Sequence, residues 1–236
     1  MATETTSAVR ANLDPRTGTV LPGEIIGRSA GLVLRYARDD DAERIVALVS
    51  AVWGEYPGKT LVATNDMPEL LAPASSYARC QGRFWVVEAG DFPRGEIIGT
   101  IALAPSKEPG VVELQKLYVA GGMRRNGLGS FLCHLVEREA RERGAHAVEL
   151  WSDVKLLDAH RRYERLGYRR GSELKAYADT SGTIRYYYRK QLEPQPASEA
   201  RRPSDIAELR PDGLQHWQML FNLDAASGAT PGRSEP

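Results

Sequence analysis

The sequence predicts a single mixed α/β domain flanked by two segments of different composition. Short runs rich in β-branched and aromatic residues alternate with segments whose apolar residues recur at helical spacing. The chain has 236 residues, which suits one domain with tails and a core that needs no disulfide bonds.

The two ends of the chain differ in composition from its middle. Residues 1–30 are rich in Thr, Ser, Gly and Pro and lack periodicity, so we expect a mostly disordered arm there. The folded domain is expected over residues 31–192. Residues 193–236 contain several prolines and polar residues, which indicates a linker and a tail. The tail carries apolar residues at the spacing of a short helix, namely Leu214, Trp217, Leu220 and Phe221.

The first part of the domain predicts a strand and two helices. Residues 32–36 form a short β-like run. Apolar residues at helical spacing follow it, between an acidic start at Asp40 and Glu43 and a stop near Gly54. Prolines interrupt the next stretch, in which residues 67–77 are the best candidate for a second helix.

The middle of the domain predicts three strands and a long helix. The strands are expected over residues 84–87, 97–103 and 111–119, and Pro- and Gly-containing turns join them. A glycine-containing loop leads into a helix over residues 128–142 with one apolar face and oppositely charged pairs on the other. Gly144 is well placed to end this helix.

The last part of the domain predicts a strand over residues 147–151 and a short helix over residues 157–166 that ends at Gly167. A final pair of strands is expected over residues 174–177 and 184–188. The prediction therefore contains seven strands.

Charge and cysteine content narrow the class of protein. Basic and acidic residues number 31 each, so no basic surface favours a nucleic-acid partner. The only cysteines, Cys80 and Cys133, lie far apart, which fits a reducing compartment. No apolar run approaches the ~20 residues that cross a bilayer, and the N-terminus lacks the apolar stretch of a secretory signal. We expect a cytoplasmic protein that binds neither nucleic acid nor a membrane.

Residues 111–130 carry the clearest functional signal. A strand leads into the loop Arg124-Arg125-Asn126-Gly127-Leu128-Gly129, and a helix begins there. Glycines let a backbone approach a ligand closely, and the N–H groups at a helix N-terminus attract anions. The expected ligand is a phosphate or pyrophosphate. The loop lacks the pattern of a P-loop and the full pattern of a dinucleotide-binding loop, which disfavours both classes.

This loop resembles the acetyl-CoA-binding motif of the GNAT superfamily, Gln/Arg-x-x-Gly-x-Gly/Ala. Residues 159–168 read AHRRYERLGY and resemble the family's second signature, a helix that ends in Tyr-Glu-x-Leu-Gly-aromatic. One helix and one strand separate the two signatures, as in the family. The resemblance covers residues 32–192, although before residue 84 it is one of layout only. It implies a central, twisted, mostly antiparallel sheet of six to seven strands with helices on both faces.

The resemblance implies that acetyl-CoA is the co-substrate and that no metal is required. Backbone N–H groups of the loop would bind the pyrophosphate, and free backbone groups of the preceding strand would hold the pantetheine arm. An N–H near Leu117 would stabilise the oxyanion. The implied cofactor-binding residues are Leu117, Tyr118, Val119, Arg124, Arg125, Asn126, Gly127, Leu128, Gly129 and Ser130.

Two side chains are expected to carry the chemistry. Glu113 sits where several family members keep a glutamate that removes a proton from the amine, and the alternative is a pairing glutamate on a strand. Glu149 and Asp153 on the next strand are reserves. Tyr163 occupies the family's usual position for the acid that protonates the leaving thiolate, and the alternative is a packed core tyrosine. Cys133 is expected to be a core residue without a nucleophilic role.

The acceptor is expected to lie between the first two helices and the last strand pair. Candidate acceptor-binding residues are Trp53, Tyr56, Tyr77 and Arg185, of which Arg185 would suit a carboxylate. The leading hypothesis is direct acetyl transfer to the primary amine of a small molecule or amino acid. Acetylation of protein N-termini or lysines, and acyl-CoA binding by a non-catalytic regulator, remain as alternatives. The resemblance also allows a homodimer.

Overall fold

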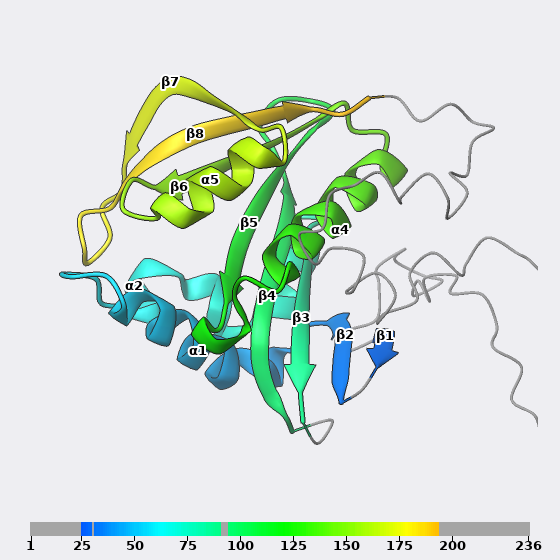
Figure 1. The fold of residues 1–236 in the computed structure, drawn as a ribbon, viewed down its shortest axis with the longest axis vertical. Coiled ribbons are helices and arrows are strands. Elements are labelled where there is room, and N and C mark those ends of the chain that lie inside the picture. The colour runs from blue at the N-terminus through cyan, green and yellow to red at the C-terminus, as the bar shows by residue number, and fades with distance from the viewer. Residues whose placement is uncertain (1–24, 30, 91–93, 194–236) are drawn as a thin grey trace, which may run out of the picture.

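The computed structural model describes residues 25–29, 31–90 and 94–193, which form one twisted sheet with helices on both faces (Figure 1). The sheet has eight strands in the order β1-β2-β3-β4-β5-β6-β8-β7. Every neighbouring pair is antiparallel except β5 and β6, which are parallel. The mixed α/β class and the mostly antiparallel sheet are therefore confirmed.

Seven of the eight strands overlap the expected regions, although the one expected over residues 174–177 begins five residues earlier, at Arg169. The eight strands are β1 (Ile25–Ser29), β2 (Leu32–Tyr36), β3 (Arg83–Ala89), β4 (Glu96–Pro105), β5 (Val111–Val119), β6 (Ala147–Asp153), β7 (Arg169–Ala176) and β8 (Ile184–Gln191). The remaining strand, β1, lies where a disordered arm was expected. It pairs with β2 across a turn in which Gly31 has a φ of 78°, so main-chain hydrogen bonds to β2 order a segment whose composition gives little sign of structure.

The helices are α1 (Ala42–Gly54), α2 (Ala63–Asp66), α3 (Pro73–Arg79), α4 (Leu128–Glu142) and α5 (Leu157–Arg165). The single helix expected over residues 67–77 is divided, because a 3-10 turn over Pro68–Leu71 precedes α3 and Ala72 between them has non-helical backbone angles. Pro73 then occupies the first turn of α3, where a missing N–H costs no helical hydrogen bond.

The residue at the N-cap of α1 is Asp41 rather than the predicted Asp40, and its side chain makes no capping hydrogen bond to the helix. Asp40 is exposed, whereas Asp41 is fully buried and accepts a hydrogen bond of 2.7 Å from the backbone N–H of Arg38. Its carboxylate also binds the buried guanidinium of Arg35. The buried ion pair therefore joins the start of α1 to β2.

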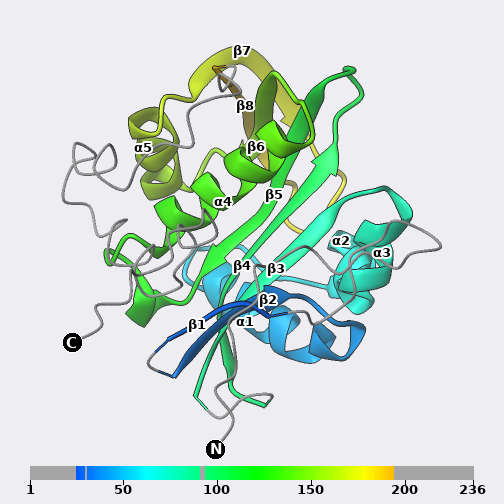
Figure 2. The ribbon, with the colours of Figure 1, turned by 90° about the vertical axis from the view of Figure 1, so that its right-hand side faces the viewer.

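Two hydrophobic cores cover the two faces of the sheet. Alternation along β3 directs Phe84 and Val86 into the core beneath α1 and α3, and Trp85 and Val87 into the core beneath α4. Figure 2 shows α4 and α5 on one side of the sheet and α2 and α3 on the other. Both faces are apolar, so helices must shield both from water.

Two predictions concern segments beyond this domain. The tail helix expected around residues 214–221 lies outside the described residues. Among the residues that are described, no helix has the length and apolar character needed to cross a bilayer.

Candidate active site

The centre of the site is the gap where β5 and β6 diverge. These parallel strands pair only from Val111 to Leu114 on β5, while β6 continues to Asp153 and β5 to Val119. Figure 1 shows β5 running down beside α1 as β6 turns away with β8 and β7. The edge of β5 that faces β6 therefore loses its strand partner beyond Leu114.

A β-bulge lies in the same part of β5. The register against β4 shifts between Gln115 and Tyr118, and Lys116 has a left-handed φ of 53°. The hydroxyl of Thr100 donates a hydrogen bond of 2.8 Å to the carbonyl of Lys116. A long side chain rarely adopts this backbone conformation, and the bulge accounts for it here by interrupting the pairing of β5 with β4.

A cavity of about 350 Å³ opens at this gap. Its walls come from β5, the end of α1, the loop after α1, the end of β6 and the β7–β8 pair. Five of the six predicted catalytic and acceptor-binding residues line it together, namely Trp53, Tyr56, Glu113, Tyr163 and Arg185, as do Leu117 and Tyr118 of the predicted cofactor-binding set. Residues far apart in the sequence thus meet in one hollow.

Tyr77 is the predicted acceptor residue that the structure places elsewhere. It is buried on α3 beneath the sheet, and it does not line the cavity. Its hydroxyl donates a hydrogen bond of 2.8 Å to the Oε1 atom of Gln115, which does line the cavity. Tyr77 therefore orients a wall residue instead of facing the hollow.

Glu113 is half-buried on β5, opposite Glu149 in the β5–β6 pairing. Burial raises the pKa of the Glu113 carboxyl above its ordinary value, and the negative charge of Glu149 adds to the rise. A hydrogen bond with Gln115 opposes this shift. The carboxylate is thus a stronger base than an exposed glutamate.

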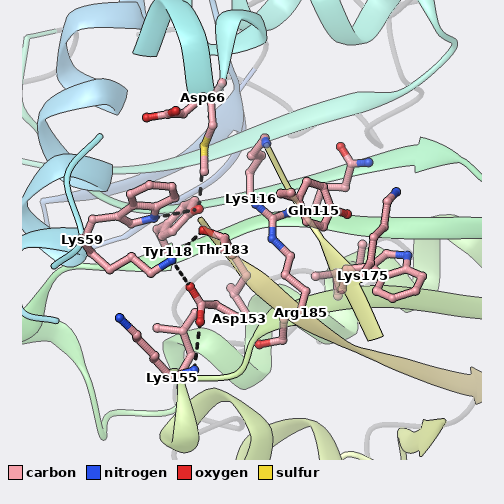
Figure 3. Close-up of a pocket in the computed structure, with 18 of the residues that line it drawn as sticks. Lys59, Asp66, Gln115, Lys116, Tyr118, Asp153, Lys155, Lys175, Thr183 and Arg185 are labelled. Atoms are coloured by element: carbon pink, nitrogen blue, oxygen red, sulfur yellow. Dashed lines mark hydrogen bonds and ion pairs between the residues drawn. The ribbon is translucent and has the colours of Figure 1, made fainter. Parts of the chain in front are cut away.

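The two reserve carboxylates are already engaged by other side chains. Glu149 accepts hydrogen bonds from the hydroxyls of Ser106, at 2.7 Å, and Tyr187, at 2.9 Å. Asp153 forms an ion pair of 2.5 Å with Lys59, which also donates a hydrogen bond to Thr183 (Figure 3). Glu113 is therefore the lining carboxylate of β5 and β6 with the fewest such partners.

Tyr163 reaches the cavity from α5. Its ring packs against the rings of Tyr168 and Tyr188, with centroids 5.9 and 5.7 Å away. Burial raises the pKa of the Tyr163 phenol well above its usual value, so the group keeps its proton at neutral pH. The side chain is thus both a packed core tyrosine and a wall of the cavity.

Tyr118 was predicted as a cofactor-binding residue through the free backbone of the strand, and its phenol faces the α1 side of the cavity. Its hydroxyl accepts a hydrogen bond of 3.3 Å from the Nε1 atom of Trp53 and contacts the sulfur of Met67 at 3.8 Å. The bulge of β5, which shifts the register between Gln115 and Tyr118, sets this direction. Only the backbone of Tyr118 remains available to the open edge of the strand.

The loop before α4 has the backbone shape of an anion site. Arg125 and Gly127 have left-handed φ angles of 64° and 81°, and no side chain caps the N-terminus of α4. The guanidinium of Arg162, from α5, lies over Gly129, where an added Cβ would come within 2.8 Å of its Cζ atom. Backbone N–H groups, the helix dipole and this cation suit the pyrophosphate of CoA.

The guanidinium of Arg124, a predicted cofactor-binding residue, is engaged by neighbouring elements of the fold. It donates hydrogen bonds to the carboxylate of Glu55 and to the carbonyl of Val119, the latter at 2.9 Å. It therefore ties the loop to α1 and to the end of β5. A second hollow beside it is lined by five arginines and two acidic residues, namely Arg124, Arg125, Arg161, Arg162, Arg165, Asp158 and Glu164, together with Gly121. The sequence did not predict that the arginines of α5 line this hollow, because the packing of α5 beside the loop brings them there.

Substitution of Gly127 by glutamate is expected to weaken acetyl-CoA binding about 100-fold, because it places a carboxylate at the anion site and strains a left-handed position. Gly144→Glu is the matched control, since Gly144 has a φ of 72° at the other end of α4 and a Cβ added there meets no atom within 4 Å. Calorimetric titration measures both. Equal loss in the two variants would contradict a cofactor site at Gly127.

Comparison with known proteins agrees with this geometry. The sequence profile of the acetyltransferase (GNAT) family matches residues 45–168, just over half of the chain. The chain is 39% identical over 140 residues to an aminoalkylphosphonate N-acetyltransferase of Salmonella typhimurium, which covers 58% of this chain and 84% of that protein. The present chain is also 29% identical to a probable N-acetyltransferase 14 of Xenopus tropicalis, and the match spans 58% of the length of that relative.

Solved structures share the fold at low sequence identity. A GNAT-family acetyltransferase of Staphylococcus aureus Mu50 superimposes with a TM-score of 0.59 at 18% identity, over 69% of this chain and 99% of that one. A Salmonella typhimurium structure with its cofactor acetyl-CoA gives a TM-score of 0.54 at 18% identity, over 72% and 99%. The chain therefore belongs to the GNAT family of acetyltransferases.

Proposed function

We propose that this acyltransferase moves the acetyl group of acetyl-CoA directly to the primary amine of a small molecule, such as an amino acid or a related amine. The observation that carries the proposal is the meeting of Glu113 and Tyr163 in one cavity at the gap between β5 and β6. A base and an acid in one hollow are what amine acylation requires.

The size of the cavity favours a small acceptor. Its volume of about 350 Å³ lies at the lower end of the range for small-molecule sites. The Salmonella typhimurium relative named as an aminoalkylphosphonate N-acetyltransferase supports the same class of acceptor. The alternative is a protein or peptide acceptor, and turnover of small amines compared with turnover of peptides distinguishes the two classes.

Glu113 removes the proton that blocks the amine. An alkyl ammonium with a pKa of about 10.4 needs roughly 4–5 kcal/mol to lose its proton at neutral pH. A carboxylate in the cavity, acting directly or through a water molecule, accepts this proton locally. The neutral amine then attacks the carbonyl carbon of the bound thioester.

Backbone and phenol groups assist the remaining steps. Bound acetyl-CoA supplies an activated acetyl group. The N–H groups at the open edge of β5 near Leu117 orient the donor and stabilise negative charge on the carbonyl oxygen. Tyr163 donates its phenolic proton to the departing sulfur. No acyl-enzyme is needed, and neither Cys80 nor Cys133 lines the cavity.

Glu113→Gln is expected to lower kcat about 100-fold at neutral pH, because the amide cannot accept the proton. In the unsubstituted protein, kcat should fall on the acid side of the pH profile as Glu113 becomes protonated. Burial, with Glu149, raises its pKa above 4.5, so this fall occurs at a higher pH than for an exposed glutamate. The measurement is kcat against pH at saturating concentrations of both substrates.

The variant should lack this acid-side fall, and its affinity for acetyl-CoA should be unchanged. An unaltered pH profile in Glu113→Gln would assign the proton transfer to another group. The same assay, run on a panel of small amines and on peptides with free N-termini or lysines, tests the acceptor class. Turnover of peptides alone would replace the small-molecule proposal.

A further inference from the structure

The β7–β8 wall of the cavity carries two positive charges side by side. Lys175 on β7 and Arg185 on β8 are direct partners in the antiparallel pairing, and both line the cavity. Like charges at opposed positions destabilise a strand pair. Among the described residues, neither side chain forms an ion pair with a carboxylate. The fold therefore keeps a repulsive pair at the rim of its active site.

Aromatic rings hold these two cations in place without neutralising them. The Cζ atom of Arg185 lies 3.9 Å from the ring centroid of Tyr177, and the Nζ atom of Lys175 lies 4.9 Å from the same ring. Lys175 also lies 5.5 Å from the ring of Trp151. Cation–π contacts orient a side chain and leave its charge available to a ligand. Figure 3 shows Arg185 extending into the hollow and Lys175 standing beside it.

The other lysines of the cavity are differently placed. Lys59 is paired with Asp153 at 2.5 Å, and Lys116 is paired with Glu69 at 2.5 Å. Lys155 is exposed, as Lys175 is, but it donates a hydrogen bond to the backbone carbonyl of Pro57. Among the described residues, Lys175 and Arg185 are therefore the cations of the cavity wall with neither a carboxylate within ion-pair distance nor a hydrogen-bonded carbonyl.

We propose that Lys175 and Arg185 form an anion subsite for the acceptor, which is then a small amine that carries a phosphonate or phosphate monoester group. Two adjacent cations match a group with up to two negative charges, and a guanidinium donates two parallel hydrogen bonds to such oxygens. Glu113 lines the same small cavity, so one molecule can present its amine to Glu113 and its anion to the pair. The inference rests on the proposed small-amine activity.

The first test compares three acceptors of equal chain length. These are 2-aminoethylphosphonate, β-alanine and β-alaninamide, which carry a phosphonate, a carboxylate and a neutral amide. The expected kcat/KM falls about tenfold at each step from phosphonate to carboxylate to amide, as each charge contact is lost. Equal kcat/KM for all three would overturn the subsite while leaving the small-amine activity intact. Preference for β-alanine would overturn the phosphonate assignment.

The second test removes the charges one at a time. Arg185→Gln and Lys175→Gln are each expected to raise KM for 2-aminoethylphosphonate about tenfold or more, with little change in KM for acetyl-CoA or in turnover of β-alaninamide. Arg170→Gln is the matched control. Arg170 also lies on β7 over an aromatic ring, 4.1 Å from Tyr186, but it does not line the cavity.

The outcomes separate the two claims. An equal loss on anionic and neutral acceptors in the Arg185 and Lys175 variants would make the pair structural and would overturn the subsite. The same loss in Arg170→Gln would do so as well. Absence of turnover with all three amines, despite acetyl-CoA binding, would overturn the small-amine activity together with the subsite.

Discussion

Tyr163→Phe is expected to lower kcat by about 10²- to 10⁴-fold, the range for loss of a positioned proton donor. The phenol reaches the cavity from α5, and burial keeps it protonated by raising its pKa. Without it, the thiolate must leave unprotonated or wait for water. The measurement is steady-state kcat with the acceptor at saturation, together with calorimetric binding of acetyl-CoA, which should change little.

A neighbouring tyrosine provides the control for this prediction. Tyr188 belongs to the same aromatic cluster, is fully buried and does not line the cavity. Tyr188→Phe removes the same oxygen atom from the same core and should leave kcat near that of the unsubstituted protein. If both variants lost kcat to the same extent, the effect would come from packing, and Tyr163 would have no role in proton transfer.

Arg35→Met is expected to lower the free energy of unfolding by about 3–5 kcal/mol, the cost of breaking a buried ion pair from one side. Arg35 is fully buried, and its guanidinium binds Asp41 at 2.7 and 2.8 Å and Glu88 at 2.6 and 3.0 Å. Removing the arginine leaves two buried carboxylates that share the partly exposed guanidinium of Arg44 as their remaining ion-pair partner among the described residues. Equilibrium denaturation with urea measures the loss.

An exposed pair supplies the comparison for this second prediction. Arg138 lies 3.9 Å from Glu142 on the open face of α4, with side chains 41% and 64% exposed. Arg138→Met should cost less than about 1 kcal/mol, because solvent screens such pairs. A loss of similar size in the two variants would mean that the buried cluster contributes no more than a surface contact.

The buried cluster around Arg35 also makes the free energy of unfolding depend on pH. Burial alone would raise the pKa of Asp41, but hydrogen bonds from Arg35 and from the Arg38 backbone hold it below its usual value of 3.8. A depressed folded-state pKa stabilises the fold above the unfolded-state value. That contribution is lost as the pH falls through the lower, folded-state pKa, so the Arg35 cluster weakens only in acid.

Much of the architecture could be predicted from local patterns in the sequence. Apolar spacing located α1, α4 and α5, and glycine ended or followed each of them at Gly54, Gly144 and Gly167, the last two with left-handed φ angles. Short runs rich in β-branched and aromatic residues located seven of the eight strands. These signals are local because a helix or strand exposes one face to the core within a few residues. The two GNAT signatures are likewise contiguous, so the family resemblance needed no tertiary information.

Other features depend on pairings between distant segments. The strand β1 exists because β2 offers it an edge, and Tyr77 and Tyr118 point where α3 and the bulge of β5 direct them. The approach of Arg162 to Gly129 depends on how α5 packs beside α4. Such directions follow from sheet twist and helix packing, which no short window of sequence encodes.

The sequence by itself therefore determined the class of fold, the family and the loop that suits a phosphate. Only the tertiary structure decided which side chains share the cavity, because the divergence of β5 and β6 and the register of β7 on β8 bring them together. The Lys175–Arg185 pair illustrates the difference. In the sequence these are two separate basic residues, whereas in the fold they are opposed cations on one wall, and that arrangement sets the chemistry expected of the acceptor.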